Sequence, residues 1–207
     1  MRPPTKLQEN LVCQAIASGL LDNVCMLAPP GSLSGEHPFG FRSAFSSCSA
    51  AMKEPIYLDP KSALYTRDWR LLPKWVCYDT IIRKSTKDGT TVVIMKNVTP
   101  IDPSWLGSLA QGSSLLRLGE PMSFPLPSYD SDRDAVLCSV VTKFGNRGWE
   151  IPPVKVEMYS TLQKVGKQST HFLVDDSFRW FARFLLEGKV LPELLNLTAF
   201  LNDDPSV

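Results

Sequence analysis

The chain has 207 residues, of which 22 are Lys or Arg and 21 are Asp or Glu, so its formal net charge is only +1. Hydrophobic residues make up 43% of the sequence, which is enough to build a folded core and excludes wholesale disorder. A nucleic-acid-binding protein that depends on bulk electrostatics would be far more basic. Any contact with RNA must therefore come from local clusters of charge or from a neighbouring domain.

The cysteines and histidines are too sparse and too scattered for a metal site. The five cysteines lie far apart, none forms a Cys-x-x-Cys pair, and there are only two histidines. This pattern excludes a zinc site and a disulfide framework, and it favours buried, reduced thiols in an intracellular protein. The sequence shows neither a signal peptide nor an apolar run of transmembrane length, so we expect a monomer in the cytosol or nucleus with no membrane partner.

The first 40 residues predict a helix and a linker. Apolar residues recur at close to the helical period over residues 11–27. Residues 28–40 contain three prolines and three glycines, which predicts a loop.

Residues 41–118 predict a small β-barrel. β-Branched and aromatic residues favour strands over residues 41–48, 55–58, 74–82 and 90–98, and Asp88-Gly89 is typical of a hairpin turn between the last two. Asp59-Pro60 and Asp102-Pro103 each place an N-cap before a proline, which predicts two short helical turns. Short antiparallel strands interrupted by capped turns indicate a five-stranded closed barrel such as an OB-fold.

The rest of the chain predicts a linker and a second, smaller domain. Residues 119–134 contain three prolines and several turn formers, so we expect a linker there. Residues 135–207 are expected to form that domain. Its predicted elements are strands over 135–144 and 154–160, a turn at 145–148, a helix opened by Asp175, Asp176 and Ser177 and ended by Gly188, and a helix over 191–201. The predicted fold class is thus α+β, mainly β with flanking helices, in which the barrel precedes a small domain of strands and two C-terminal helices.

Motifs for self-contained catalysis are missing. The run Gly166-Lys167-Gln168-Ser169-Thr170 imitates the end of a phosphate-binding loop, but it lacks the first glycine and has Gln168 where a hydroxyl is required. The sequence contains neither Gly-x-Ser-x-Gly nor His-Glu-x-x-His. We therefore predict no catalytic residue, no metal and no cofactor in this chain.

Cations and aromatic residues gather around the third and fourth predicted strands. The RNA-binding candidates there are Arg83, Lys84, Lys87, Lys96 and Tyr78, because Lys and Arg can follow a phosphate backbone while aromatic rings stack on bases. The alternative is that Tyr78 is a core residue, as Trp75 would be, and that the lysines only solvate a hairpin.

A second group of candidates lies in the C-terminal part. Lys143 and Arg147 are further RNA-binding candidates, and Trp149 follows them as a contact to RNA or to a protein partner, unless it fills the core beside Ile151-Pro152-Pro153. The segment 178–184 is apolar on nearly all sides of a helix, so Trp180 and Arg183 belong either to a docking surface or to a helix enclosed by the fold.

Several runs resemble a known family. Pro55–Tyr65, Leu72–Asp79 and Lys96–Leu106 resemble, in order and at the family's spacing, three segments of the OB-fold that follows the motor of DEAH-box RNA helicases. The opening helix is similar to the end of the helical bundle before that OB-fold. Phe144–Pro153 and Arg179–Gly188 resemble the extra C-terminal domain of the Dhr/Kurz branch, the nucleolar helicases of small-subunit ribosome assembly.

The resemblance implies a function that composition does not. It implies a non-catalytic C-terminal module of an ATPase that releases the U3 small nucleolar RNA from pre-ribosomal RNA, with ATP and Mg²⁺ bound in motor domains elsewhere. The implied partners are pre-ribosomal or small nucleolar RNA, the protein's own helicase core and processome proteins, and the implied location is the nucleus and nucleolus. The rival hypothesis is a protein-interaction platform that recruits the helicase without touching RNA, and an independent enzyme is a distant third. The lysine-rich hairpin favours the RNA module, whereas the near-neutral charge and the aromatic C-terminal helices favour the platform.

Overall fold

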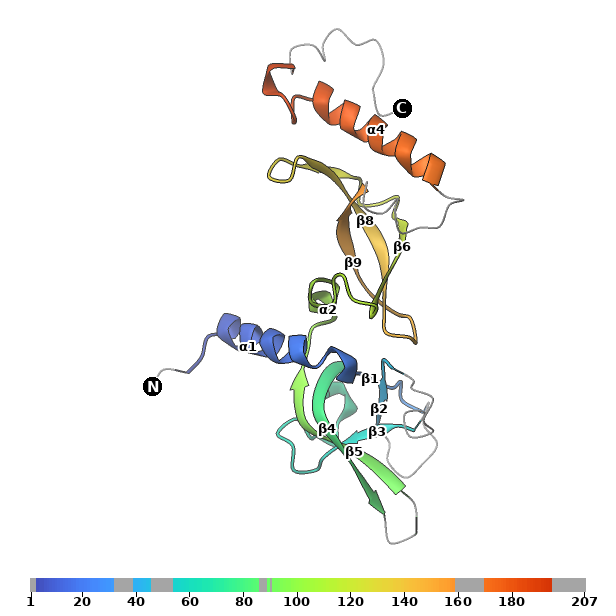
Figure 1. Ribbon diagram of the computed structural model, residues 1–207. Helices are drawn as coiled ribbons and strands as arrows, with labels where there is room; N and C mark the ends of the chain where they lie inside the picture. The colour runs from blue at the N-terminus through green and yellow to red at the C-terminus, as the bar shows by residue number, and fades with distance from the viewer. Residues whose placement is uncertain are drawn as a thin grey trace. The chain divides into compact units, whose positions relative to one another are not determined.

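A computed structural model describes residues 3–31, 39–45, 54–85, 89, 91–158 and 170–194. These residues form mainly β-strands with three α-helices, and five of the strands close into a barrel (Figure 1). Both features confirm the predicted fold class and the predicted OB-type barrel. The chain divides into two compact units, Met1–Arg117 with Thr142–Pro152 and Leu118–Val141 with Pro153–Val207. This division is not the linear one expected from the sequence, because residues 142–152 belong with the barrel.

The barrel consists of β1 (Val24–Leu27), β2 (Phe41–Ser43), β3 (Ile56–Leu58), β4 (Trp75–Ser85) and β5 (Thr91–Pro100). Its strand order is β1-β2-β3-β5-β4, and β4 pairs back with β1 to close it. β3 and β5 are parallel, whereas the other pairs are antiparallel. Small and branched apolar side chains fill the core, where the buried members include Ile56, Val76, Val93 and Met95.

The N-terminal helix is shorter at its C-terminal end than predicted. α1 (Lys6–Gly19) begins at a capping box, in which the Thr5 hydroxyl accepts the Gln8 N–H and the Gln8 side chain accepts the Thr5 N–H. The prediction of one helix up to residue 27 is wrong, because a short 3₁₀ turn over Leu21–Asn23 follows α1 and the next residues form β1. β1 gains ladder hydrogen bonds on both edges, from β2 and β4, which a local pattern cannot reveal.

The two Asp-Pro sites behave differently. Asp102 caps α2 (Pro103–Leu109) by accepting the Ser104 N–H at 2.9 Å, as the sequence predicts. Asp59 also accepts a backbone N–H, from Lys61 at 3.0 Å, but only turns follow it before the 3₁₀ segment Trp69–Leu71. The helical turn predicted at Asp59-Pro60 is therefore a capped turn without a helix.

The remaining strands are β6 (Leu116–Pro121), β7 (Ser128–Asp130), β8 (Ala135–Phe144) and β9 (Trp149–Glu157). They form one sheet in the order β6-β8-β7, with β9 also paired to β8. The expected linker at 119–134 thus contains β7 and part of β6. β8 has its predicted bounds, whereas β9 begins earlier than predicted and includes two exposed prolines.

α4 (Thr170–Leu186) packs within the second unit, where Trp180, Phe181 and Phe184 cover a core built from β8 residues such as Val136 and Val140. The predicted helix start at Asp175–Ser177 is wrong, since α4 is already helical at Thr170. The predicted last helix over 191–201 lies mostly outside the described residues.

Candidate nucleic-acid interface

The β4–β5 hairpin carries the first group of predicted cations. Side chains of β4 are buried from Trp75 to Tyr78, and from Asp79 to the end of the strand they are exposed except at Ile81. Figure 1 shows the two strands continuing as a long ribbon beyond the barrel. Arg83 pairs with Val93 and Lys84 with Val92, and both cations are exposed. Successive side chains on a strand point to opposite faces, so the ribbon offers one cation on each face.

Lys87, the third cation predicted at this tip, lies outside the described residues.

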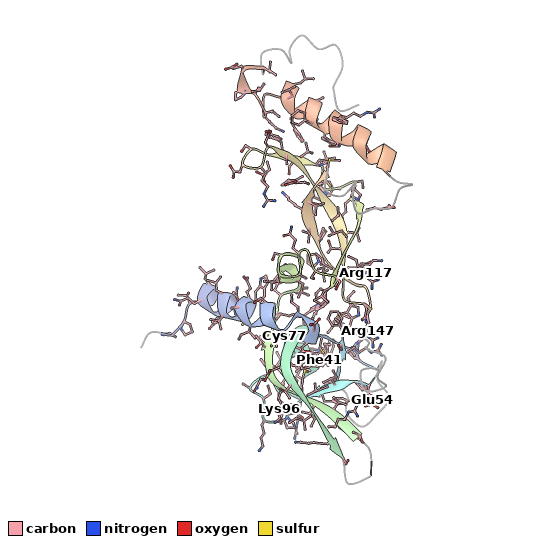
Figure 2. The ribbon with its side chains drawn as sticks, in the orientation of Figure 1. Phe41, Glu54, Cys77, Lys96, Arg117 and Arg147 are labelled. Carbon is pink, nitrogen blue, oxygen red and sulfur yellow. The ribbon has the colours of Figure 1, made fainter. Side chains whose placement is uncertain are left out.

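Lys96 is already engaged inside the protein. Its ammonium group forms an ion pair with the buried carboxylate of Asp59, which also accepts the Lys61 N–H. The hydrogen bond from Lys96, followed by that from Lys61, holds the pKa of Asp59 below its usual range. Lys96 on the barrel, labelled in Figure 2, therefore has a structural partner that any RNA phosphate would have to compete with.

Tyr78 is not available to a nucleobase. Its side chain is only 2% exposed and packs in the barrel core, and burial raises its pKa to about 12. The prediction of Tyr78 as an RNA-binding residue does not hold, because its ring faces the barrel core. Trp75 packs in the core as well.

The second group of cations lies at the turn end of the β8–β9 hairpin, and this end, Thr142–Pro152, is part of the first unit. Lys143 is exposed on β8, and Arg147 lies in the turn, where its N–H donates to the Ala44 carbonyl at 3.3 Å. The Gly145 N–H donates to the Leu115 carbonyl at 2.8 Å, and this register sets Arg117 opposite Lys143. Figure 2 labels both Arg117 and Arg147. Arg117 was not predicted from the sequence, because only the strand pairing brings it to Lys143.

Two cations facing each other across a sheet repel, so an anion bound between them would relieve a cost that the free protein carries. Arg117 and Lys143 together are therefore a second candidate phosphate contact. Their placement comes from pairing between segments 26 residues apart, which a single run of sequence does not show.

The three docking candidates contact other parts of the protein. Trp149 packs edge-to-face on Trp75, with ring centroids 5.3 Å apart, and is half-buried against the barrel core. In the second unit, the Arg183 guanidinium lies 5.1 Å above the Trp180 ring, and its Nε donates to Glu187 at 2.6 Å. These contacts give all three side chains a structural role, and their role in docking stays a prediction.

The described part of the chain shows neither a metal site nor a membrane-spanning helix. It contains no group of three or more His, Cys, Asp or Glu side chains that could hold a metal ion. None of its helices has the length and apolar character needed to cross a bilayer.

Residues 12–112 match a family model described as the oligonucleotide/oligosaccharide-binding (OB)-fold. The matched segment contains all five barrel strands and α2. This segment is therefore similar to that family, and its five-stranded closed barrel has the OB-type fold. The β4–β5 hairpin belongs to the OB-fold domain, whereas α4 and the second sheet lie outside the matched residues.

The chain is also similar to proteins named as RNA helicases. It is 26% identical over 205 residues to "Probable ATP-dependent RNA helicase DHX37" of Homo sapiens, which covers 99% of this chain and 15% of that protein. It is 27% identical over 206 residues to "Probable ATP-dependent RNA helicase kurz" of Drosophila melanogaster, covering 100% of this chain and 16% of that protein. "ATP-dependent RNA helicase DEAH13" of Arabidopsis thaliana is 26% identical over 203 residues, which are 98% of this chain and 13% of that protein.

The chain therefore spans about 15% of the length of these relatives. Because the similarity continues beyond the OB-fold domain, the second unit also has a counterpart in them. The resemblance to the OB-fold region of DEAH-box RNA helicases is thus confirmed.

Proposed function

We propose that this chain is the non-catalytic RNA-binding module of an ATP-dependent DEAH-box RNA helicase, in which the OB-fold domain holds single-stranded RNA beside the motor. The observation that carries the proposal is the cationic β4–β5 hairpin, which presents Arg83 and Lys84 to solvent on a ribbon that extends from the barrel. OB-folds bind oligonucleotides through such loops and strand faces. ATP and Mg²⁺ would bind in motor domains and not in this chain.

The finer part of the proposal concerns the biological setting. We place the helicase in small-subunit ribosome assembly, where it would release the U3 small nucleolar RNA from pre-ribosomal RNA in the nucleolus. Two features support this setting, namely the similarity to the kurz protein over the full chain and the Dhr/Kurz-like runs Phe144–Pro153 and Arg179–Gly188. Pre-ribosomal RNA, the helicase core and processome proteins would then be the partners.

A salt titration of single-stranded RNA binding, followed by fluorescence anisotropy, tests RNA binding. The wild-type chain is compared with Arg83→Glu/Lys84→Glu. For single strands the logarithm of the association constant falls with the logarithm of salt concentration by about 0.7 per phosphate contact. Losing two contacts should reduce that slope by about 1.4 and weaken binding at low salt.

The matched control is Lys6→Glu/Arg179→Glu, which makes the same change in net charge at two exposed positions away from the hairpin. If the hairpin variant and the control weaken RNA binding equally, the RNA responds to overall charge and the hairpin is no specific contact. If the wild-type chain does not bind RNA even at low salt, the proposal fails.

A protein-interaction platform is the second candidate function, and one observation favours it. α1 exposes apolar side chains along its length, with Leu7 at 68%, Leu11 at 54% and Val12 at 58% exposure. Apolar side chains in a row on a helix are typical of an interface. The platform predicts that the chain binds helicase or pre-ribosomal proteins when RNA binding is absent.

A further inference from the structure

A cavity of about 510 Å³ lies in the first unit beside the root of the β4–β5 hairpin. Pockets for small ligands typically measure roughly 300–1,000 Å³, so its size suits one nucleotide. Its walls come from Phe39, from β2, β3, β4 and β5, and from the segment between Pro60 and Leu72. No single run of sequence indicates this cavity, because its walls are distant from one another along the chain.

Aromatic rings dominate the walls. Phe39, Phe41, Tyr57 and Tyr65 all line the cavity. Phe41, labelled in Figure 2, is 1% exposed and belongs to the barrel core, whereas Tyr65 is 46% exposed and lies toward the solvent. Burial raises the pKa of Tyr57, so its phenol is partly withdrawn from water. A flat apolar ligand could therefore enter past Tyr65 and contact rings on more than one side.

Strand pairing fixes one wall. Tyr57 of β3 lies opposite Ile94 of β5, and Val92 of β5 lies opposite Lys84 of β4. Val92 and Ile94 are two residues apart and thus share one face of the sheet. The side chains of Tyr57 and Lys84 are consequently on the same face of the sheet, with the two apolar side chains of β5 between them.

The charges around the cavity have one sign. Among the described residues that line it, the charged ones are Arg67 and Lys84, and none carries a carboxylate. Lys84 also lowers the pKa of Asp59, but the Asp59 carboxylate already forms an ion pair with Lys96 and accepts the Lys61 N–H. The hydroxyls of Thr66 and Ser85 add polar groups to the same lining. An apolar peptide side chain would leave both cations without a counterion, whereas a nucleotide supplies an aromatic base and an anion together.

We propose that this cavity binds one base of single-stranded RNA, stacked against Tyr57 and Tyr65, with the adjoining phosphate held by Arg67 and Lys84. The inference rests on the proposed function, since it names the RNA element that the OB-fold domain would take beyond simple phosphate contact. Stacking depends on the π-face that every base has, so the site discriminates weakly among bases.

The first test is an NMR titration of the full chain with AMP, ribose 5-phosphate and adenosine. We expect AMP to shift the amide signals of residues 57, 65, 67 and 84, and to bind at least about fivefold more tightly than ribose 5-phosphate, which has no base to stack. Adenosine should also bind more weakly, because it lacks the phosphate. Equal binding of AMP and ribose 5-phosphate, or shifts confined to residues outside the cavity, would overturn the proposal.

The second test uses variants at exposed positions, so that folding is preserved. Tyr65→Leu should weaken binding of AMP and of single-stranded RNA by about fivefold or more, whereas Tyr65→Phe keeps the ring and should bind as the wild type does. Arg67→Gln should weaken binding, while Arg70→Gln, an exposed arginine three residues away that does not line the cavity, is the matched control.

The two proposals fail in different ways. If RNA binds and the hairpin variant weakens it, but Tyr65→Leu and Arg67→Gln bind as the wild type does, the RNA-binding function stands and the base pocket is wrong. If RNA and AMP both fail to bind, both are wrong. If an apolar or aromatic peptide shifts the cavity residues while AMP does not, the cavity is a protein-binding site and the base pocket is again wrong.

Discussion

Among the described glycines, Gly145 has the least space for an added methyl group, so Gly145→Ala should lower the stability of the first unit. It begins the turn that joins β8 to β9, with φ of +70°, and its N–H donates to the Leu115 carbonyl. A Cβ atom at this position would lie 2.6 Å from the Ala44 carbonyl oxygen and 3.0 Å from the Ala44 Cβ. Ala44 cannot easily retreat, because it is fully buried and its own N–H is hydrogen-bonded to Val24.

The expected cost of Gly145→Ala has two parts. The left-handed backbone costs a residue with a side chain about 1–2 kcal/mol, and forcing a group into packed surroundings costs about 1–3 kcal/mol. We therefore expect a loss of about 2–5 kcal/mol in the free energy of unfolding. Gly112→Ala is the matched control, because Gly112 has φ of +79° with nothing within 4 Å of its added Cβ, so only the backbone part applies.

Urea unfolding followed by tryptophan fluorescence measures the difference. Trp69, Trp75, Trp105 and Trp149 all belong to the first unit, so the signal reports mainly on it. With a denaturant slope of about 2 kcal/mol per molar, Gly145→Ala should lower the midpoint by about 1–2.5 M and Gly112→Ala by about 0.5–1 M. Equal shifts for the two variants would refute the claim that the turn presses against Ala44.

Two further predictions concern single contacts. Lys96→Met removes the cation that holds the pKa of Asp59 below its usual range. A carboxyl group whose pKa is lower in the folded than in the unfolded protein stabilises the fold above the unfolded pKa, and this stabilisation is lost as the pH falls through the folded pKa. The urea midpoints of variant and wild type should therefore differ at pH 7 and converge toward pH 3. A gap that stays constant with pH would contradict this linkage. Trp149→Leu loses the edge-to-face contact with Trp75 and should cost about 2 kcal/mol in urea unfolding, whereas Phe124→Leu, at a side chain 77% exposed, should cost under about 0.5 kcal/mol. Similar costs for these two would show that Trp149 adds little to the core.

Local signals were sufficient for some elements and not for others. Asp102-Pro103 predicts α2 correctly, because an N-cap and a proline in the first turn act within a few residues. β1 was missed because Val24 and Cys25 continue an apolar helical pattern, and only pairing with β2 and β4 makes them a strand. The start of α4 was placed too late, because acidic residues that are typical of a first turn lie inside this helix.

The candidate interface shows the same limit. Charge clustering predicted that Arg83 and Lys84 would be exposed on a hairpin, and they are. The same clustering could not show that Lys96 pairs with Asp59, which is 37 residues away and directly follows β3. Nor could it place Tyr78 in the core, since a ring in an alternating strand can face either side. The cavity depended on strand register and on a turn-rich segment, neither of which composition encodes.

Residues 142–152 return to the first unit after the chain has passed through part of the second, so the core of the OB-fold domain is completed late during synthesis. Phe144 and Ile151 complete the core that Val24 and Leu106 begin, yet they emerge from the ribosome only after the strands and turns of residues 118–141. During synthesis one apolar side of the barrel would stay exposed to solvent until the chain has been made to about residue 152. Any expression fragment designed to end where the family match ends, at residue 112, would keep that exposed side permanently.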